Sequence, residues 1–350
     1  MTGSTTTDSI PVAEGIEGPV LITGAAGFIG SHLARSLLAA GVPVAGVDSF
    51  DAFYDRRRKE ANLDATAAVA AAHAAAGASF SLREADIRDT EAMAELMARH
   101  RPRLVVHIAA LAGVRPSIAE PARYASVNVD GLVTVLEAAR TADCRAVLFA
   151  SSSSVYGNNR TVPFAEDHDV SEPISPYAAT KRAGELICHT YSHLFDMAIG
   201  SLRFFTVFGP AQRPDLAIAK FMRLIAAGET VPMFGDGTSS RDYTFVADIV
   251  RGILAAGRTV QGEVAAGRRF CRIWNLGGSE PVSLAEMIDA IAETVGRPAR
   301  IERQPMQPGD VDRTWADLTR SRAELGFDPR TPFREGLAAQ WAWTREAGVG

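Results

Sequence analysis

Cysteine is scarce in this chain. Its 350 residues contain three cysteines, Cys144, Cys188 and Cys271, which are scattered and odd in number. Their spacing fits neither a disulfide framework nor a zinc site, so we predict that no metal is bound. Isolated reduced thiols are typical of cytoplasmic proteins, and a cytoplasmic location is our expectation.

Excess positive charge and long apolar runs are also missing. The formal net charge is -5, whereas nucleic acids and anionic membranes favour concentrated Lys and Arg. No apolar segment approaches the roughly 20 residues of a membrane helix. We therefore expect neither a nucleic-acid partner nor a membrane partner, and any anionic ligand must be bound by local groups.

The first 18 residues carry no chemistry that we can assign. They are rich in Thr, Ser and acidic residues, and they lack the basic start and apolar run of a signal peptide. We predict that residues 1–18 form a flexible tail.

Short apolar runs alternate with helical patterns along the first two thirds of the chain. This alternation predicts parallel strands joined by crossover helices, and hence an α/β fold with a doubly wound parallel sheet of the Rossmann type. The expected strands are 19–23, 42–47, 79–85, 104–109, 146–150 and 198–207.

Beyond residue 208 the chain becomes richer in Pro and Gly, which predicts a smaller C-terminal α/β lobe. We assign 19–208, together with about 241–270, to a Rossmann domain. We assign 209–240 and 271–350 to a substrate-binding lobe. Such a lobe is expected over the carboxyl ends of the strands, where open α/β sheets bind ligands.

A glycine pattern follows the first expected strand. Residues 23–30 read TGAAGFIG and lead into a helical pattern. Gly24 permits a tight turn, Gly27 lets a phosphate approach backbone N–H groups, and Gly30 allows close packing of the helix. The order of strand, glycine loop and helix predicts a dinucleotide site.

Acidic residues end the second and third strands. Asp48 lies about 20 residues after the glycine loop, where a carboxylate binds both ribose hydroxyls and repels a ribose phosphate. NAD is therefore favoured over NADP, although the basic run 56–58 could hold such a phosphate. Asp86 and Ile87 are placed to meet the adenine.

Catalytic side chains are expected at the start of a later helix. Ser175 can cap this helix and Pro176 fits its first turn. Tyr177 and Lys181 are four residues apart and share one face, so the ammonium can stabilise a phenolate that acts as a base. The serine run 151–154 follows the fifth strand and offers a hydroxyl to the reacting oxygen.

These motifs together resemble the nucleotide-sugar epimerase/dehydratase branch of the extended short-chain dehydrogenase/reductases. The resemblance covers about 20–343 and includes AALAGVRPS at 109–117 and RDYTFVADIV at 241–250. It implies catalytic roles for Ser152, Tyr177 and Lys181, with Ser154 as a second candidate hydroxyl. It also implies a homodimer. The residues predicted to contact the cofactor are Gly24, Gly27, Phe28, Ile29, Gly30, Asp48, Asp86, Ile87, Ala109, Ala110, Ala112, Asn128, Tyr177 and Lys181.

The resemblance also bears on the reaction. Dehydratases of this family carry Asp-Glu before the VYG tripeptide, and related decarboxylases carry Glu, but this chain has Ser153 and Ser154. The segments RFFTVFGP at 203–210 and RPD at 213–215 are similar to UDP-glucuronate 4-epimerases, which commonly have Trp-Gly where this chain has Ala-Gln at 211–212.

We therefore expect NAD-dependent inversion at C4 of a UDP-sugar, with UDP-glucuronate converted to UDP-galacturonate. The resemblance implies that Arg241 holds the pyrophosphate, and Arg213 is the first choice for the sugar carboxylate. The residues predicted to bind the substrate are Arg115, Thr206, Arg213, Lys220, Arg241 and Asp310. Two alternatives stay open: a UDP-glucose/UDP-galactose 4-epimerase in which Arg213 is structural, and a noncatalytic NAD-binding scaffold.

Overall fold

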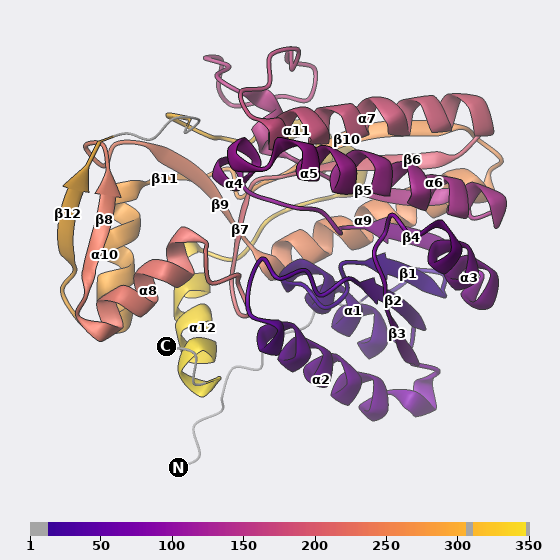
Figure 1. Cartoon of the computed structure of the whole chain (residues 1–350), viewed down its shortest axis with the longest axis horizontal. Coiled ribbons are helices and arrows are strands. Elements are labelled where there is room, and N and C mark those ends of the chain that lie inside the picture. The colour runs from indigo at the N-terminus through magenta and orange to yellow at the C-terminus, as the bar shows by residue number, and fades with distance from the viewer. Residues whose placement is uncertain (1–12, 306–310, 348–350) are drawn as a thin grey trace.

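A sheet of seven parallel strands forms the centre of the computed structural model, which describes residues 13–305 and 311–347 (Figure 1). The strand order is β10-β6-β5-β4-β1-β2-β3, so the direction of winding reverses between β1 and β4. This order confirms the predicted doubly wound α/β fold. The strands are β1 (Val20–Thr23), β2 (Val44–Asp48), β3 (Phe80–Glu84), β4 (Leu104–His107), β5 (Ala146–Ser152), β6 (Ala198–Phe204) and β10 (Phe270–Leu276).

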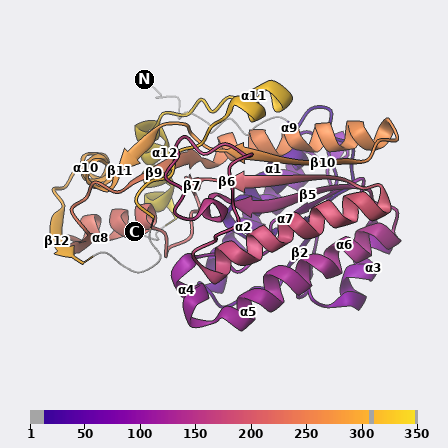
Figure 2. The ribbon, with the colours of Figure 1, turned by 90° about the horizontal axis from the view of Figure 1, so that it is seen from above.

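Helices cover both faces of this sheet (Figure 2). Every residue of β1, β2, β4 and β5 is buried, as expected for parallel strands packed on two sides. One face carries α1 (Phe28–Ala39), α2 (Arg56–Ala72), α9 (Val246–Ala265) and α11 (Thr319–Leu325), and the other carries α3 (Thr90–His100), α6 (Gly131–Thr141) and α7 (Pro176–Phe195).

Short helical segments complete the sheet domain. They are η1 (Ala74–Ala76), α4 (Val114–Ala119), α5 (Pro121–Ala125), η2 (Ser126–Asp130) and η3 (Ser153–Tyr156). None of the described helices combines the length and the hydropathy that crossing a bilayer requires.

A smaller lobe lies beyond the carboxyl ends of the strands, at the left of Figure 1. Asp242 joins three segments of the lobe. Its buried carboxylate accepts hydrogen bonds from the backbone N–H groups of Gly278, Ser279 and Ala316. The lobe consists of the three-stranded sheet β7 (Thr206–Phe208), β9 (Ser240–Phe245) and β11 (Pro281–Ser283), the pair β8 (Thr230–Phe234) and β12 (Arg300–Gln304), and helices α8 (Ala217–Ala227), α10 (Leu284–Val295) and α12 (Phe333–Glu346).

Two predicted boundaries differ from the structure. The central sheet continues through β10 to Leu276, beyond the predicted limit at residue 270. Asn275 made this segment resemble a loop, yet it is fully buried because its side chain donates to the carbonyls of Phe164 and Asp317 and accepts from Tyr156. The expected strand 198–207 is divided into β6 and β7, because β7 leaves the central sheet to pair with β9.

The predicted tail also ends earlier than residue 18; residues 1–12 lie outside the described part of the chain. Ala13 and Ile16 are buried, and Ile16 packs against α9 at Gly257. The Gln261 side chain accepts a hydrogen bond from the N–H of Glu17 and donates one to its carbonyl. The residues before β1 therefore belong to the sheet domain.

Replacing Ile16 with Ala should lower the free energy of unfolding, because a buried aliphatic side chain is lost and leaves a cavity. For a buried residue this loss is about 2 to 5 kcal/mol. Urea denaturation measures it, and Ile301→Ala, at a side chain that is 46% exposed, provides the control. Equal and small losses in the two variants would show that residues 13–18 contribute nothing to the fold.

Candidate active site

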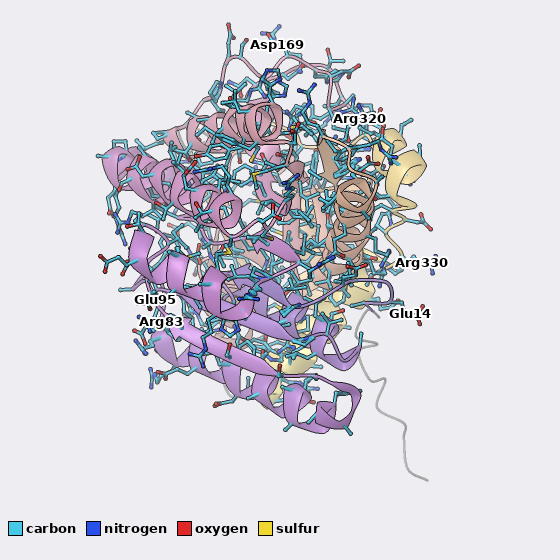
Figure 3. All side chains as sticks on the ribbon, turned by 90° about the vertical axis from the view of Figure 1, so that its right-hand side faces the viewer. Glu14, Arg83, Glu95, Asp169, Arg320 and Arg330 are labelled. Carbon is cyan, nitrogen blue, oxygen red and sulfur yellow. The ribbon has the colours of Figure 1, made fainter. Side chains whose placement is uncertain are left out.

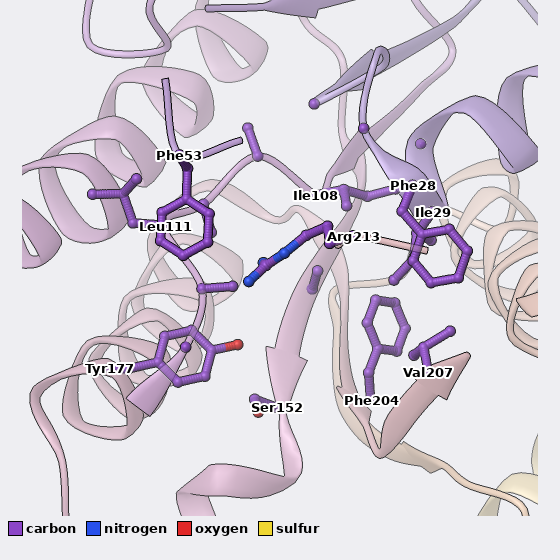
Figure 4. A pocket seen from close by; sticks show the side chains of 18 of the residues that line it. Phe28, Ile29, Phe53, Ile108, Leu111, Ser152, Tyr177, Phe204, Val207 and Arg213 are labelled. Atoms are coloured by element: carbon purple, nitrogen blue, oxygen red, sulfur yellow. The ribbon is translucent and has the colours of Figure 1, made fainter. Parts of the chain in front are cut away.

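A cavity of about 420 Å³ lies at the carboxyl ends of the strands, where the winding of the sheet reverses (Figure 4). We call it the central pocket. Its walls are the glycine loop, the ends of β2 and β3, and the segments 108–113, 150–154, 204–207 and 213–216. Segments far apart in the sequence therefore meet at one opening.

The glycine loop leaves room for a phosphate. Gly24 adopts φ +73°, and a Cβ atom at Gly30 would lie 2.1 Å from the carbonyl oxygen of Gly24. No side chain caps the start of α1, and its first turn has no acidic residue. Because free N–H groups at a helix start attract anions, this geometry fits the pyrophosphate of a dinucleotide.

Thr23 joins the glycine loop to the segment after β4. Its hydroxyl accepts hydrogen bonds from the N–H groups of Ile108 and Ala109, at 3.1 and 3.0 Å, and shares a hydrogen bond of 2.8 Å with Nδ1 of His107. Burial lowers the pKa of His107 to about 3, and the charge of Lys181 adds to this effect. The buried imidazole of His107 is therefore neutral.

Asp48 lines the central pocket as predicted, but it has a cationic partner. Its carboxylate accepts hydrogen bonds from the N–H groups of Ala26 and Phe50, at 3.2 and 2.9 Å. Lys59 donates to the same carboxylate at 3.0 Å, and both side chains are less than a tenth exposed. These contacts aim the carboxylate, and they add a cation beside the predicted ribose position.

Lys59 was not among the residues predicted for the cofactor site. In the sequence it is the last residue of a basic run. Two arginines of that run make ion pairs outside the pocket: Arg56 pairs with Glu60 and Glu84, and Arg57 pairs with Asp55. Among these basic residues, the structure therefore places Lys59 next to the cofactor site.

Ser152, Tyr177 and Lys181 all line the central pocket, and Figure 4 shows the Tyr177 hydroxyl and Ser152 directed toward the same space. Burial raises the pKa of Tyr177, while a hydrogen bond with Ser152 and the charge of Arg213 oppose this rise. The Ser152 hydroxyl also donates to the hydroxyl of Ser154 at 3.1 Å. The predicted hydroxyl groups are thus close to one another.

The expected effect of Lys181 on the Tyr177 phenolate stays a prediction. The ammonium lies 6.0 Å from the centre of the Tyr177 ring and donates to the Ala150 carbonyl at 2.7 Å. Burial lowers its pKa to about 7. The charge of Arg213 also lowers the pKa of Tyr177.

A buried ion pair fixes α7 to the sheet one turn beyond Lys181. Glu185 accepts hydrogen bonds from Ser151 at 2.6 Å and from Arg203 at 2.8 and 2.9 Å, and all three residues are buried. The guanidinium of Arg203 also lies 4.7 Å from the ring centre of Tyr156. Sequence reasoning did not single out this network, which positions the serine run.

Arg213 reaches into the central pocket from the lobe (Figure 4). Asp215 holds its guanidinium through two hydrogen bonds of 3.0 and 2.7 Å. Phe53 of the sheet domain lies against the same group, with its ring centre 4.7 Å from the guanidinium carbon. The Arg213 side chain is 17% exposed, so it offers a fixed cation within the site.

Most predicted cofactor residues surround the central pocket, and Thr206 and Arg213 lie there among the predicted substrate residues. Asn128 is not among the described residues that line it; its side chain instead bonds to both backbone groups of Leu111. The predicted residues that do line the pocket are Gly24, Gly27, Phe28, Ile29, Gly30, Asp48, Asp86, Ile87, Ala109, Ala110, Ala112, Ser152, Ser154, Tyr177, Lys181, Thr206 and Arg213.

Three predicted substrate residues lie outside the described lining. The guanidinium carbon of Arg115 lies 5.0 Å from the ring centre of Phe234. Lys220 is exposed on α8, and Arg241 donates a hydrogen bond to the Ser240 carbonyl. Asp310 lies outside the described residues. The substrate contacts of all four stay predictions.

Residues 21–340 match the family model described as GDP-mannose 4,6 dehydratase. The chain belongs to this family. Within it, the chain is 37% identical to a probable UDP-glucuronate 4-epimerase of Rhizobium meliloti, over 92% of this chain and 96% of the relative.

Two solved structures resemble the whole fold. The UDP-glucuronic acid 4-epimerase of Bacillus cereus, in complex with UDP-glucuronic acid and NAD, is 31% identical, with a TM-score of 0.84 over 94% of this chain and 99% of that chain. The UDP-glucose 4-epimerase of Thermotoga maritima, with UDP-glucose, is 29% identical, with a TM-score of 0.82 over 94% and 99%.

Changing Asp48 to Asn should weaken NAD binding by roughly tenfold to a hundredfold, because hydrogen bonds to a charged group stabilise by about 1.5 to 3 kcal/mol. It should also improve NADP binding, since Lys59 would lose its carboxylate partner. Calorimetry on cofactor-free protein measures both affinities, with Asp64→Asn on the exposed side of α2 as the control. Unchanged NAD affinity would remove Asp48 from the ribose site.

His107 should make stability depend on pH. Its folded pKa is about 3 against an ordinary value of 6.5, so between these values the unfolded chain binds the proton more strongly. Stability should fall as the pH drops below about 6.5, by about 1.4 kcal/mol per pH unit from this residue. Urea titrations of the wild type and His107→Asn at pH 7 and pH 5 measure the difference, and identical pH slopes would contradict a buried neutral imidazole.

Proposed function

We propose that this protein is an NAD-dependent epimerase that inverts C4 of a UDP-sugar and converts UDP-glucuronate to UDP-galacturonate. The observation that carries the proposal is the meeting of Ser152, Tyr177 and Arg213 around one cavity beside the glycine loop. The relatives named UDP-glucuronate 4-epimerase support the same assignment. Incubation with UDP-glucuronate and with UDP-glucose, followed by separation of the products, tests it.

The site residues suit proton transfer at a sugar hydroxyl. Ser152 would bind the C4 oxygen, and Tyr177 as phenolate would take its proton and later return it. When bound, NAD accepts the C4 hydride and returns it, and its positive ring would add to Arg213 in stabilising the phenolate. The glycine loop and Asp48 would hold that cofactor. Inversion at C4 would follow if the 4-keto sugar turned its opposite face toward the cofactor before reduction.

The carboxylates of the central pocket argue against elimination of water. Removal of water from the sugar needs a free acid and base, and the positions before the VYG tripeptide hold serines. Each carboxylate in the described lining has a cationic partner: Asp48 pairs with Lys59, Asp51 with Arg123, Asp86 with Arg88, and Asp215 with Arg213. Removal and return of a hydride is the chemistry that remains.

Arg213 is suited to a sugar carboxylate. Oxidation of a glucuronate at C4 gives a β-keto acid, which loses carbon dioxide readily. A guanidinium that binds the carboxylate stabilises it relative to the neutral gas, and it can do so through two parallel hydrogen bonds. Asp215 and Phe53 would fix the direction of that guanidinium before the substrate binds.

The location and assembly belong to the same proposal. We place the enzyme in the cytoplasm, where reduced cysteines are common. A homodimer built through long helices is supported by exposed apolar side chains on α7, where Leu186 is 54% and Leu194 is 61% exposed.

Tyr177→Phe should abolish turnover while preserving the fold and cofactor binding, since only the proton-accepting oxygen is removed. General acid–base catalysis contributes about 10²- to 10⁴-fold, so a loss of at least a hundredfold in kcat is expected. Steady-state kinetics measures it, and the melting temperature and NAD affinity serve as controls. Turnover close to that of the wild type would reject Tyr177 as the base.

Arg213→Ala should lower activity on both sugars, because the Tyr177 phenolate loses a nearby cation, and the loss on UDP-glucuronate should be much the larger. The expected loss in kcat/KM is the equivalent of about 2 to 4 kcal/mol, because a charge-assisted pair is lost and the substrate carboxylate is left unpaired. More carbon dioxide should also be released. Parallel kinetics on the two sugars measures the difference.

Asp215→Asn is the matched control, since it keeps the cation and removes only the partner charge. It should retain the preference for UDP-glucuronate. Equal losses on both sugars in Arg213→Ala would favour a UDP-glucose/UDP-galactose 4-epimerase with a structural arginine.

A further inference from the structure

A second cavity, of about 220 Å³, lies on the face of the sheet that α9 covers. Four residues of α9 form one wall: Arg251, Leu254, Ala255 and Arg258, which are spaced to share one side of the helix. The segment 325–330, which joins α11 to α12, forms the other wall. We call this cavity the arginine pocket, and no residue that we assign to catalysis lines it.

Positive charge dominates the arginine pocket. Arg251, Arg258 and Arg330 line it, against one acidic lining residue, Asp328. Arg330 and Asp328 are 3.8 Å apart and mostly exposed, so their pair adds little stability and can rearrange. Figure 3 shows Arg330 at the molecular surface, where a dissolved ligand can reach it.

Arg251 has hydrogen-bonding capacity that the fold does not use. One of its terminal nitrogens donates to Asp248, yet its buried Nε has no hydrogen-bond partner among the described residues. Asp248 is also occupied by the N–H groups of Arg330 and Thr331, so it ties α9 to the opposite wall. A buried donor without a partner is rare in proteins and indicates a missing acceptor.

The charges and the shape fit a phosphate group. Even when the buried Asp248 is counted with Asp328, the three arginines leave the site positive. A guanidinium group can bind a phosphate through two parallel hydrogen bonds. Three guanidinium groups, from both walls of the pocket, can therefore contact several phosphate oxygens at once. Leu254 and Ala255 lie between Arg251 and Arg258 on α9 and offer apolar surface to the rest of a small ligand.

We propose that the arginine pocket is a second binding site, for a small phosphate monoester. Among the described residues, it shares no lining residue with the central pocket. The ligand would bridge α9 and the segment before α12. It would thereby fasten the lobe helix α12 to the helix that follows β9. This proposal is independent of the reaction assigned to the central pocket.

Calorimetry with glucose 1-phosphate and with inorganic phosphate tests the proposal. The protein is first saturated with NAD and UDP, so that phosphate groups already occupy the central pocket. We expect saturable binding of both probes. The double variant Arg258→Ala/Arg330→Ala should weaken it by at least about tenfold, since each charge-assisted hydrogen bond stabilises by about 1.5 to 3 kcal/mol. Both side chains are exposed, and within the described part of the chain the variant loses only the Arg258 hydrogen bond to the Glu14 carbonyl, so the melting temperature should fall little.

Arg334→Ala is the matched control, because Arg334 is an exposed arginine near the same segment and pairs with Glu293. It should bind the probes as the wild type does. Absence of saturable binding would overturn the proposal, as would equal affinity in the wild type and the double variant. Glucuronate that binds as tightly as glucose 1-phosphate would reject the choice of phosphate.

Discussion

Two consecutive turns of α7 are bonded to two consecutive residues at the end of β5. Lys181 donates to the Ala150 carbonyl, and Glu185 accepts from the Ser151 hydroxyl. These bonds fix the rotation and the height of α7 relative to the sheet. The positions of Tyr177 and Ser152 follow from them, because one lies a turn before Lys181 and the other directly follows Ser151.

Burying the charged carboxylate of Glu185 is unfavourable, and neighbouring hydrogen-bond donors compensate for the lost hydration. Burial alone would raise the pKa of Glu185, but hydrogen bonds from Arg203, Ser151 and Arg182 hold it below its ordinary value. Removal of one partner from a buried ion pair leaves an uncompensated charge, which destabilises a protein by about 3 to 5 kcal/mol. The pair is therefore a positioning device that the fold cannot lose without disturbing the catalytic helix.

The glycine loop, the parallel strands and the presence of Tyr177 at the central pocket could be predicted because each depends on local sequence. A strand, a tight glycine turn and a helix follow one another within a few residues, and Tyr177 and Lys181 are one helical turn apart. Lys59 and Glu185 escaped prediction because their partners, Asp48 and Arg203, become neighbours only after the chain folds. The charge of Arg213 lowers the pKa of Tyr177 because the lobe places the two side chains close together. No local sequence pattern predicts that placement.

In the proposed reaction, hydride leaves C4 of the sugar and returns to the same carbon. UDP-glucuronate labelled with deuterium at C4 tests this claim most directly. We predict that the UDP-galacturonate formed in ordinary water keeps its deuterium at C4, because the hydride never exchanges with solvent. Loss of the label to water, or its appearance at another carbon, would contradict the account.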